Sequence, residues 1–284
     1  MSIFRSDGDQ HDPFPVLNDT DSVAESLNMT TFAQPYGPAC CGTCTHRKFS
    51  NTAGMIFLSI ETSTHVCSVA AVDGDRCLAQ ELDARGQNHA RLLSRFIDRV
   101  LDAVSRDGRQ IDAVALSQGP GSYTGLRIGT ATAKGLCYGL DLPLVPVDTL
   151  QAIAMSALRT YAPHDDDLLV CPMIDARRME VYTAFYDTHL NRQGDVEAVV
   201  VNDDSFHNVL DTHRVLFCGN GAAKCADMLH HPNAVFVADI MPEAQYVGML
   251  AARQYDPAAP TDIAYFDPFY LKEFQAVRSR NKLW

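Results

Sequence analysis

Hydrophobic residues near the start of the patterned part of the chain fall into short runs separated by polar turns. The runs at 56–60, 67–72 and 76–82 have the length and composition of strands. Asp73-Gly74-Asp75, between the last two, is typical of a hairpin turn. The acid and hydroxyl run Glu61-Thr62-Ser63-Thr64 follows the first strand. The pattern predicts three neighbouring strands with a polar turn at the end of the first.

Two amphipathic stretches follow and predict helices. Apolar residues in 89–104 recur at spacings of three and four, which is the period of one helix face. A second helix is predicted at 124–140, between strands at 111–117 and 142–147. This order of strands and helices predicts an α/β lobe.

Small residues mark the second of these helices. It begins in the run Gln118-Gly119-Pro120-Gly121-Ser122-Tyr123-Thr124-Gly125, and Gly125, Gly129 and Ala133 recur every four residues. Glycine in a helix interior costs about 1 kcal/mol relative to alanine. We therefore expect another backbone to pack closely against this face.

The second half of the chain repeats the opening order. An apolar strand at 168–174, an acidic turn beginning at Asp175 and a strand at 180–187 echo the strand, polar turn and strand of the first half. The echo predicts duplicated lobes, here 55–155 and 156–284. The remaining elements expected in the second lobe are a strand at 215–218 that ends at Gly219 and helices near 222–229 and 243–255.

Residues 1–54 have a different character, because they are polar, rich in proline and without a sustained period. We expect an extension outside the folded part, disordered or artefactual, and a physiological start at Met55. Cys40, Cys41, Cys44 and His46 supply only half of a zinc-finger ligand set, so no metal site is predicted there.

Composition narrows the classes of function. The chain has 284 residues, a net charge of −12 and 46% hydrophobic residues, enough for two lobes with real cores. An acidic chain does not wrap nucleic acid by bulk electrostatics. No apolar run is long enough to span a bilayer and no secretory signal is visible, and the nine cysteines are interpreted as reduced thiols. We expect a cytoplasmic protein that makes no membrane contact.

Three motifs carry a specific resemblance. They are Ile60-Glu61-Thr62-Ser63-Thr64, the run from Gly119 to Gly129, and Ile174-Asp175-Ala176-Arg177 with Glu180-Val181-Tyr182. Together they resemble the TsaB (YeaZ) family, also described as glycoprotease-like, over essentially all of 55–284. The resemblance implies the actin-like ATPase (ASKHA) superfamily, an α/β fold with two lobes of ribonuclease-H-like topology.

The resemblance also implies a function and partners. Proteins of this family pair with the catalytic homologue TsaD and the ATPase TsaE, in a complex that transfers a threonylcarbamoyl group to N6 of adenosine 37 in tRNAs reading ANN codons. The expected role is a non-catalytic subunit that scaffolds and activates TsaD. ATP and magnesium would be used by the complex, without tight binding to this chain, and tRNA would be reached only through the complex.

The expected absence of catalysis has a local reason. The catalytic homologue carries a metal-binding H-x-x-x-H after the fifth strand, and the matching positions here are Thr149 and Ile153. The family turn also usually carries Asp where this chain has Glu61, which makes magnesium binding doubtful. No catalytic residue and no metal ligand is therefore predicted.

Two sets of candidate site residues follow. The first-lobe helices are expected to pack against the same helices of TsaD, or to form a homodimer, through His89, Leu93, Phe96, Ile97, Val100, Gly125, Ile128, Gly129, Thr132 and Ala133. A nucleotide turn is predicted from Glu61, Thr62, Ser63, Asp175 and Gly219. Bulk introduced at Gly129 is expected to abolish partner binding while leaving the monomer folded.

Two alternatives remain open. The chain could be an ATP-dependent enzyme acting alone through Glu61, Thr62, Asp175 and Gly219. It could also be a peptidase, the least favoured option, because neither Ser63 nor Ser122 has a histidine at a recognised spacing.

Overall fold

The computed structural model describes residues 54–86, 88–161 and 167–272. The predictions for the N-terminal extension, including Cys40, Cys41, Cys44 and His46, therefore lie outside the described residues, apart from Gly54.

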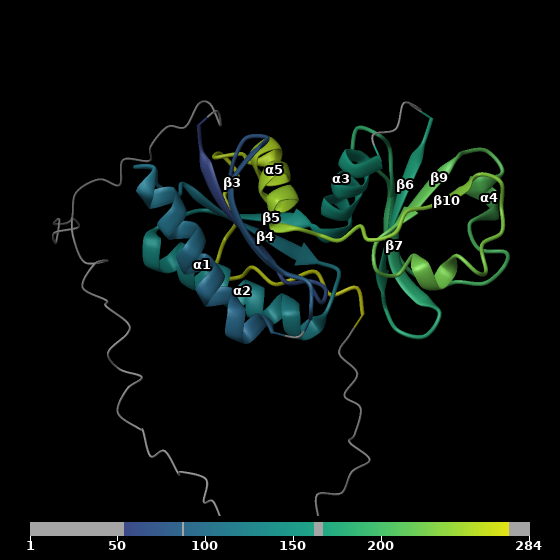
Figure 1. Cartoon of the computed structure of the whole chain (residues 1–284), viewed down its shortest axis with the longest axis horizontal. Coiled ribbons are helices and arrows are strands. Elements are labelled where there is room, and N and C mark those ends of the chain that lie inside the picture. Colours follow the sequence, from purple (N-terminus) through teal and green to yellow (C-terminus); the bar gives the residue numbers. More distant parts are fainter. Residues whose placement is uncertain (1–53, 87, 162–166, 273–284) are drawn as a thin grey trace, which may run out of the picture. The chain divides into compact units, whose positions relative to one another are not determined.

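The first sheet contains five strands in the order β3-β2-β1-β4-β5 (Figure 1). β1 pairs antiparallel with β2 and parallel with β4, as in the pairs Ile60↔Val69 and Phe57↔Ala113. The bounds are β1 Ile56–Glu61, β2 Cys67–Asp73, β3 Arg76–Asp83, β4 Ala113–Gly119 and β5 Leu144–Asp148. The helices between them are α1 His89–Arg106 and α2 Tyr123–Leu140.

Both faces of this sheet are buried at β1, β2, β4 and β5, which explains why these strands are mostly apolar. On β1, Leu58 and Ile60 belong to the cluster beneath α1 and α2, whereas Phe57 belongs to the cluster on the opposite face. Figure 1 shows α1 and α2 on one side of the sheet and α5 (Ala244–Gln254) on the other. Alternate residues of each strand thus enter different cores.

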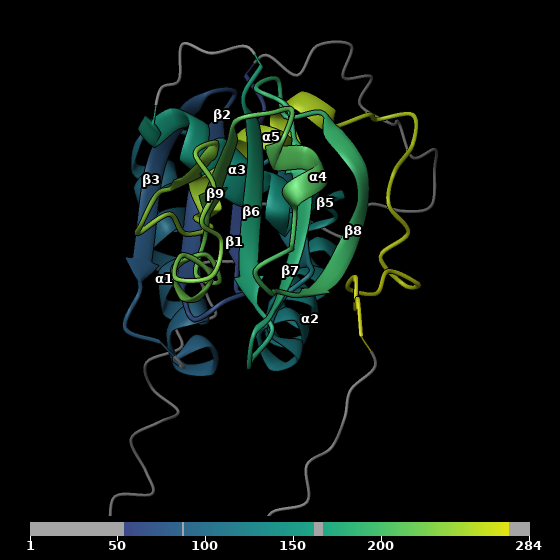
Figure 2. The same ribbon diagram turned by 90° about the vertical axis from the view of Figure 1, so that its right-hand side faces the viewer.

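The second sheet repeats this topology. Its order is β10-β9-β6-β7-β8, in which β6 to β10 correspond in turn to β1 to β5 (Figure 2). β6 pairs antiparallel with β7 and parallel with β9. The bounds are β6 Leu169–Asp175, β7 Glu180–Tyr186, β8 Arg192–Val200, β9 Val215–Cys218 and β10 Ala234–Phe236, with a short helix α4 His207–Leu210 after β8. The repeat confirms the predicted two-lobed α/β fold class.

The C-terminal helix α5 corrects the predicted division into lobes. We expected 243–255 to close the second lobe, yet α5 packs against β1 and β2 of the first sheet and against α3 Thr149–Tyr161. Gly248 lets it approach closely, since a Cβ there would lie 2.6 Å from Ser59 Oγ and 2.6 Å from a methyl of Val72. The expected helix at 222–229 is only a 3₁₀ turn, Ala223–Cys225.

The chain after α5 returns to the first lobe before Lys272 forms an ion pair with Glu180 of the second. The N–H of Phe269 donates to the carbonyl of Gln118 at 2.8 Å, and Tyr270 packs on Tyr123 with ring centres 4.9 Å apart. Among the described residues, no helix combines the length and apolar character needed to cross a bilayer.

Candidate functional site

The polar turn after β1 is closed to solvent. Glu61, Thr62 and Ser63 are each 0% exposed. The Glu61 carboxyl accepts hydrogen bonds from the Ser63 N–H at 2.6 Å and the Ser63 hydroxyl at 2.5 Å. The Thr62 hydroxyl donates to the carbonyl of Gly125 at 2.8 Å. The turn therefore uses its polar groups on its own lobe.

Helix α2 seals this turn through its glycines. A Cβ at Gly125 would lie 2.0 Å from the carbonyl oxygen of Thr62, and one at Gly129 would lie 2.3 Å from the Thr62 hydroxyl. At the N-terminus of α2, the N–H of the N-cap residue Ser122 donates to the carbonyl of Ser63 at 2.6 Å. The sequence predicted a close backbone on this face, and that backbone is the chain's own β1–β2 turn.

This packing corrects two expectations. Glu61, Thr62 and Ser63 were predicted to grip a nucleotide phosphate, but α2 occupies the space in front of them. Bulk at Gly129 was predicted to disturb only partner binding, but it would collide with Thr62 inside the lobe.

Glu61 is an unusual buried acid. Its Oε2 atom has no hydrogen-bond partner among the described residues. Burial raises the pKa of Glu61 above the ordinary value, and the hydrogen bonds from Ser63 offset only part of this effect. A raised pKa means that the folded state favours the neutral carboxylic acid.

The pH dependence of stability tests the state of Glu61. Because the folded-state pKa is raised, the contribution of Glu61 is fully present below the unfolded pKa of about 4.5 and is lost as the pH rises through the folded pKa. We expect Glu61→Gln, which does not ionise, to gain stability over the wild-type protein as the pH is raised from 4 to 8. Urea unfolding at each pH measures the difference. A constant difference across that range would contradict the raised pKa.

The positions matched to metal-binding histidines are also buried. Thr149 and Ile153, on α3, are each 0% exposed. The Thr149 hydroxyl hydrogen-bonds the Ser117 hydroxyl at 2.6 Å and accepts from the Gly119 N–H at 3.1 Å. Thr149 thus ties the ends of β4 and β5 together, and Ile153 is part of the apolar core.

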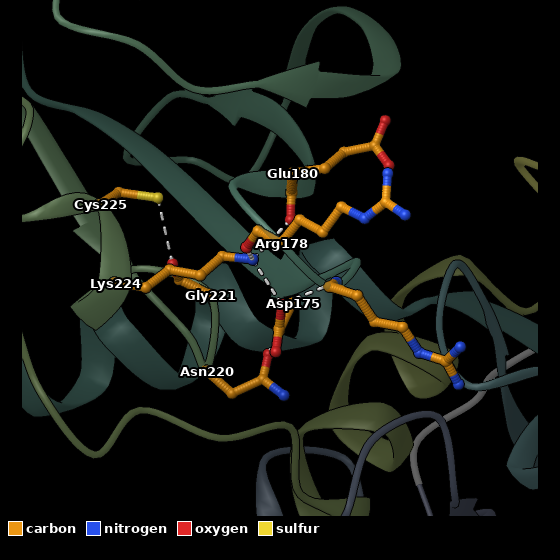
Figure 3. Close-up of polar contacts among 8 residues, drawn as sticks. Asp175, Arg178, Glu180, Asn220, Gly221, Lys224 and Cys225 are labelled. Atoms are coloured by element: carbon orange, nitrogen blue, oxygen red, sulfur yellow. Dashed lines mark hydrogen bonds and ion pairs between the residues drawn. The ribbon is translucent and has the colours of Figure 1, made fainter.

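The acidic turn of the second lobe differs from that of the first because it is open and carries its own cation. The side chain of Asp175 is 45% exposed and forms an ion pair with Lys224, which lies in the 3₁₀ turn after β9. The Lys224 ammonium also donates to the carbonyls of Arg178 at 2.8 Å and Glu180 at 2.7 Å (Figure 3). An ammonium has three N–H donors, and all three are used in this cage of oxygens.

The glycines around this turn allow the close approach. Gly219 has φ +93°, and a Cβ there would lie 2.5 Å from the carbonyl oxygen of Met173. Asn220 reaches back and accepts from the Asp175 N–H at 3.0 Å. β6 and β9 pair in parallel, so their carboxyl ends meet at the same edge of the sheet. Asp175 ends β6 and Gly219 follows β9, and the two predicted residues are therefore neighbours.

Arg177 and Arg178 adopt left-handed backbone conformations in succession, with φ of 72° and 50°. Each such residue other than glycine costs roughly 1–3 kcal/mol. The Glu180 N–H donates to the carbonyl of Arg177 at 3.1 Å, and Lys224 holds the carbonyl of Arg178. Lys224 thus supports a strained turn whose two arginine residues are exposed.

Most of the predicted interface residues point into the first lobe, which is a further correction. The Nε2 of His89 hydrogen-bonds the carbonyl of Val66 at 3.0 Å. The side chains at His89, Leu93, Phe96, Ile97, Val100 and Ala133 are buried, as are Gly125 and Gly129, whereas Ile128 and Thr132 are half-buried. The amphipathic period identified the face that packs on the chain's own sheet.

Two features escaped the sequence reasoning. Lys224 could have been sought as the counter-ion of Asp175, five residues after Gly219. A second stripe of small residues on α2, Ala131, Gly135 and Gly139, is exposed, and nothing lies within 4 Å of a Cβ at either glycine. Its four-residue spacing can be read in the sequence, but the predicted packing face was only the neighbouring stripe of Gly125, Gly129 and Ala133, which has the same spacing.

Comparison with protein families gives one match, over residues 83–247, more than half of the chain. The matching family model is described as TsaD: tRNA N6-adenosine threonylcarbamoyltransferase.

Individual relatives carry a different name. The chain is 37% identical over 129 residues to a tRNA threonylcarbamoyladenosine biosynthesis protein TsaB of Haemophilus influenzae, covering 45% of this chain and 52% of that protein. It is 27% identical over 225 residues to the TsaB protein of Escherichia coli, covering 77% of this chain and 95% of that protein. These matches confirm the resemblance to TsaB.

A solved structure supports the same conclusion. YeaZ from Pseudomonas aeruginosa aligns with a TM-score of 0.66 and 26% identity, covering 76% of this chain and all of that chain.

Proposed function

We propose that this chain, which belongs to the TsaD family, takes part in tRNA threonylcarbamoyladenosine biosynthesis as a non-catalytic subunit that binds and activates a catalytic TsaD-type transferase. Its work would take place in the cytoplasm, with tRNA and an ATPase of the TsaE type engaged by the assembled complex. Relatives named TsaB cover most of the patterned chain, which supports assignment to this pathway.

One observation carries the non-catalytic part of the proposal. The positions where a catalytic relative would hold its metal are Thr149 and Ile153, both fully buried and used in packing. A hydroxyl tied to Ser117 and an aliphatic side chain offer no pair of imidazoles to a metal ion. This favours a subunit that acts through its surface.

The exposed stripe on α2 is the surface that we assign to the transferase. Glycine at positions 135 and 139 lowers helix stability by about 1 kcal/mol each without serving any contact within the described residues. Tyr138, on the same outer side, is 86% exposed. Small residues beside an exposed aromatic side chain suit the close approach of a second helix, from TsaD or from another copy of this chain.

Substitution of Gly135 by leucine tests this surface. The added side chain meets open space in the monomer, so the free protein should remain folded. Against a packed partner helix it should weaken binding by about 5- to 160-fold, as expected for overpacking of about 1–3 kcal/mol. Size-exclusion chromatography with the transferase measures the complex. Ala259→Leu places the same leucine side chain at an exposed position away from α2, with a gain of three carbons where Gly135→Leu gains four, and should have no effect. Equal behaviour of the two variants would reject the assignment.

Reconstitution tests the function itself. The chain and the TsaD-type protein of the same organism are assayed alone and together for threonylcarbamoyl transfer to tRNA, with TsaE and the substrates supplied. We expect transfer only when this chain and an active TsaD-type protein are both present. Transfer by this chain without TsaD would establish an enzyme acting alone, and transfer by TsaD at full rate without this chain would remove the proposed role.

Calorimetric titration of the isolated chain with magnesium-ATP tests the alternative function, an ATP-dependent enzyme acting alone. A lone ATP-dependent enzyme must bind the nucleotide, whereas the closed Glu61 turn and the Lys224-filled Asp175 turn favour no tight binding. Heat of binding at micromolar ATP would support the alternative.

A further inference from the structure

The strained turn between β6 and β7 is built to hold two arginine residues at the surface. Arg177 and Arg178 are consecutive left-handed residues, a conformation that glycine adopts without strain. The half-buried ammonium of Lys224 donates all its hydrogen bonds to Asp175 and to the turn's own carbonyls. Strain of this kind, actively supported by neighbours, points to a use for the two side chains.

The acidic residues near these arginines are already paired with lysines. The nearby acids Asp175 and Glu180 are paired with Lys224 and Lys272, respectively. Within the described ranges neither Arg177 nor Arg178 has an ion-pair partner within 4.0 Å. On a chain of net charge −12, the turn is therefore a local site of excess positive charge.

Neighbouring groups extend this positive site toward α2. Lys272 connects the turn to the C-terminal segment through its ion pair with Glu180. Two residues earlier, Tyr270 packs on Tyr123, and the guanidinium of Arg127 lies 4.6 Å from the centre of the Tyr123 ring. Cations beside aromatic rings are the groups with which proteins hold an RNA backbone and stack on its bases.

We propose that Arg177 and Arg178 form a phosphate-binding arm for the RNA backbone, so that this subunit itself contacts tRNA within the complex. The inference rests on the proposed function for its RNA partner. Each guanidinium presents a planar fork that matches two phosphate oxygens. Because the rest of the chain is acidic and repels a polyanion, the arm fixes where RNA touches this subunit.

The test uses Arg177→Gly/Arg178→Gly in the full chain assembled with the transferase. Glycine suits positive φ, so the variant should melt at the same temperature as the wild-type protein or higher. Its affinity for tRNA, measured by fluorescence anisotropy, should fall, and the slope of log K against log salt should be shallower by about 1.4 to 1.8, the loss of two phosphate contacts. Between 50 and 200 mM salt the wild-type complex should then lose about tenfold more affinity than the variant.

Two matched variants isolate the effect of charge at this turn. Arg177→Lys/Arg178→Lys keeps both charges and should retain most of the salt slope. Arg76→Ala/Arg106→Ala removes two exposed arginines at the start of β3 and the end of α1 and should leave tRNA binding unchanged. An unaltered slope in the glycine pair, or equal losses in the glycine and lysine pairs, would overturn the proposal.

Failure of the proposed function has a different signature. If no complex with the transferase forms, the partner assignment is wrong, and the same titration on this chain alone still compares the wild-type and glycine-pair proteins. If the complex forms and modifies tRNA but the salt slope is the same for both, only the arginine arm is wrong.

Discussion

Replacing Gly125 by alanine is expected to destabilise the protein by about 3 kcal/mol, an unusually large effect for the addition of one methyl group. The new Cβ would lie 2.0 Å from the carbonyl oxygen of Thr62. The obstacle is backbone, and it is anchored by the hydrogen bonds of the β1–β2 turn. To remove this clash, α2 must move away from the first sheet, which exposes the buried β1–β2 turn.

Gly135→Ala on the same helix is the matched control. The substitution is identical, but a Cβ there meets nothing within 4 Å. We expect helix propensity to dominate and to stabilise the protein by about 1 kcal/mol. Urea unfolding of the two variants should thus give changes of opposite sign, and a Gly125→Ala protein as stable as the wild type would show that α2 does not pack on Thr62 in this way.

Replacing Lys224 by methionine should give the second large effect, a loss of about 2–3 kcal/mol. Hydrogen bonds to charged groups contribute roughly 1.5–3 kcal/mol each, and Lys224 makes three. The sum is reduced because Asp175 is 45% exposed and water can replace the ammonium there. Removal of the lysine also withdraws support from the left-handed residues Arg177 and Arg178.

Lys134→Met provides the comparison for this prediction. Lys134 also donates to a backbone carbonyl, that of Ala264 at 3.2 Å, but this is its single hydrogen bond within the described part of the chain. We expect a change within about 0.5 kcal/mol. Thermal and urea unfolding of both methionine variants measure the contrast. Equal small losses of stability would mean that water replaces the Lys224 ammonium at the three oxygens without cost.

The sequence was most informative where one local rule was enough. The runs that form β1, β2 and β4 are mostly apolar because both faces of the first sheet are covered at these strands, and the α1 period identified its buried face. β8 was missed because its residues at the sheet edge are mostly exposed and do not alternate. α3 received no prediction because it is buried on nearly all sides and has no polar stripe to define a period.

The sequence by itself determined the duplicated α/β order, the resemblance to TsaB and the absence of metal-binding side chains at positions 149 and 153, because these depend on local pattern and residue identity. Only the tertiary structure decided which backbone the Gly125 stripe contacts, that α5 joins the first lobe, and that Lys224 fills the Asp175 turn. Each of those contacts joins residues at least 44 positions apart in the chain, as in the pair Glu180 and Lys224. Helix periodicity shows that a face is buried, but the partner of that face depends on how distant elements pack.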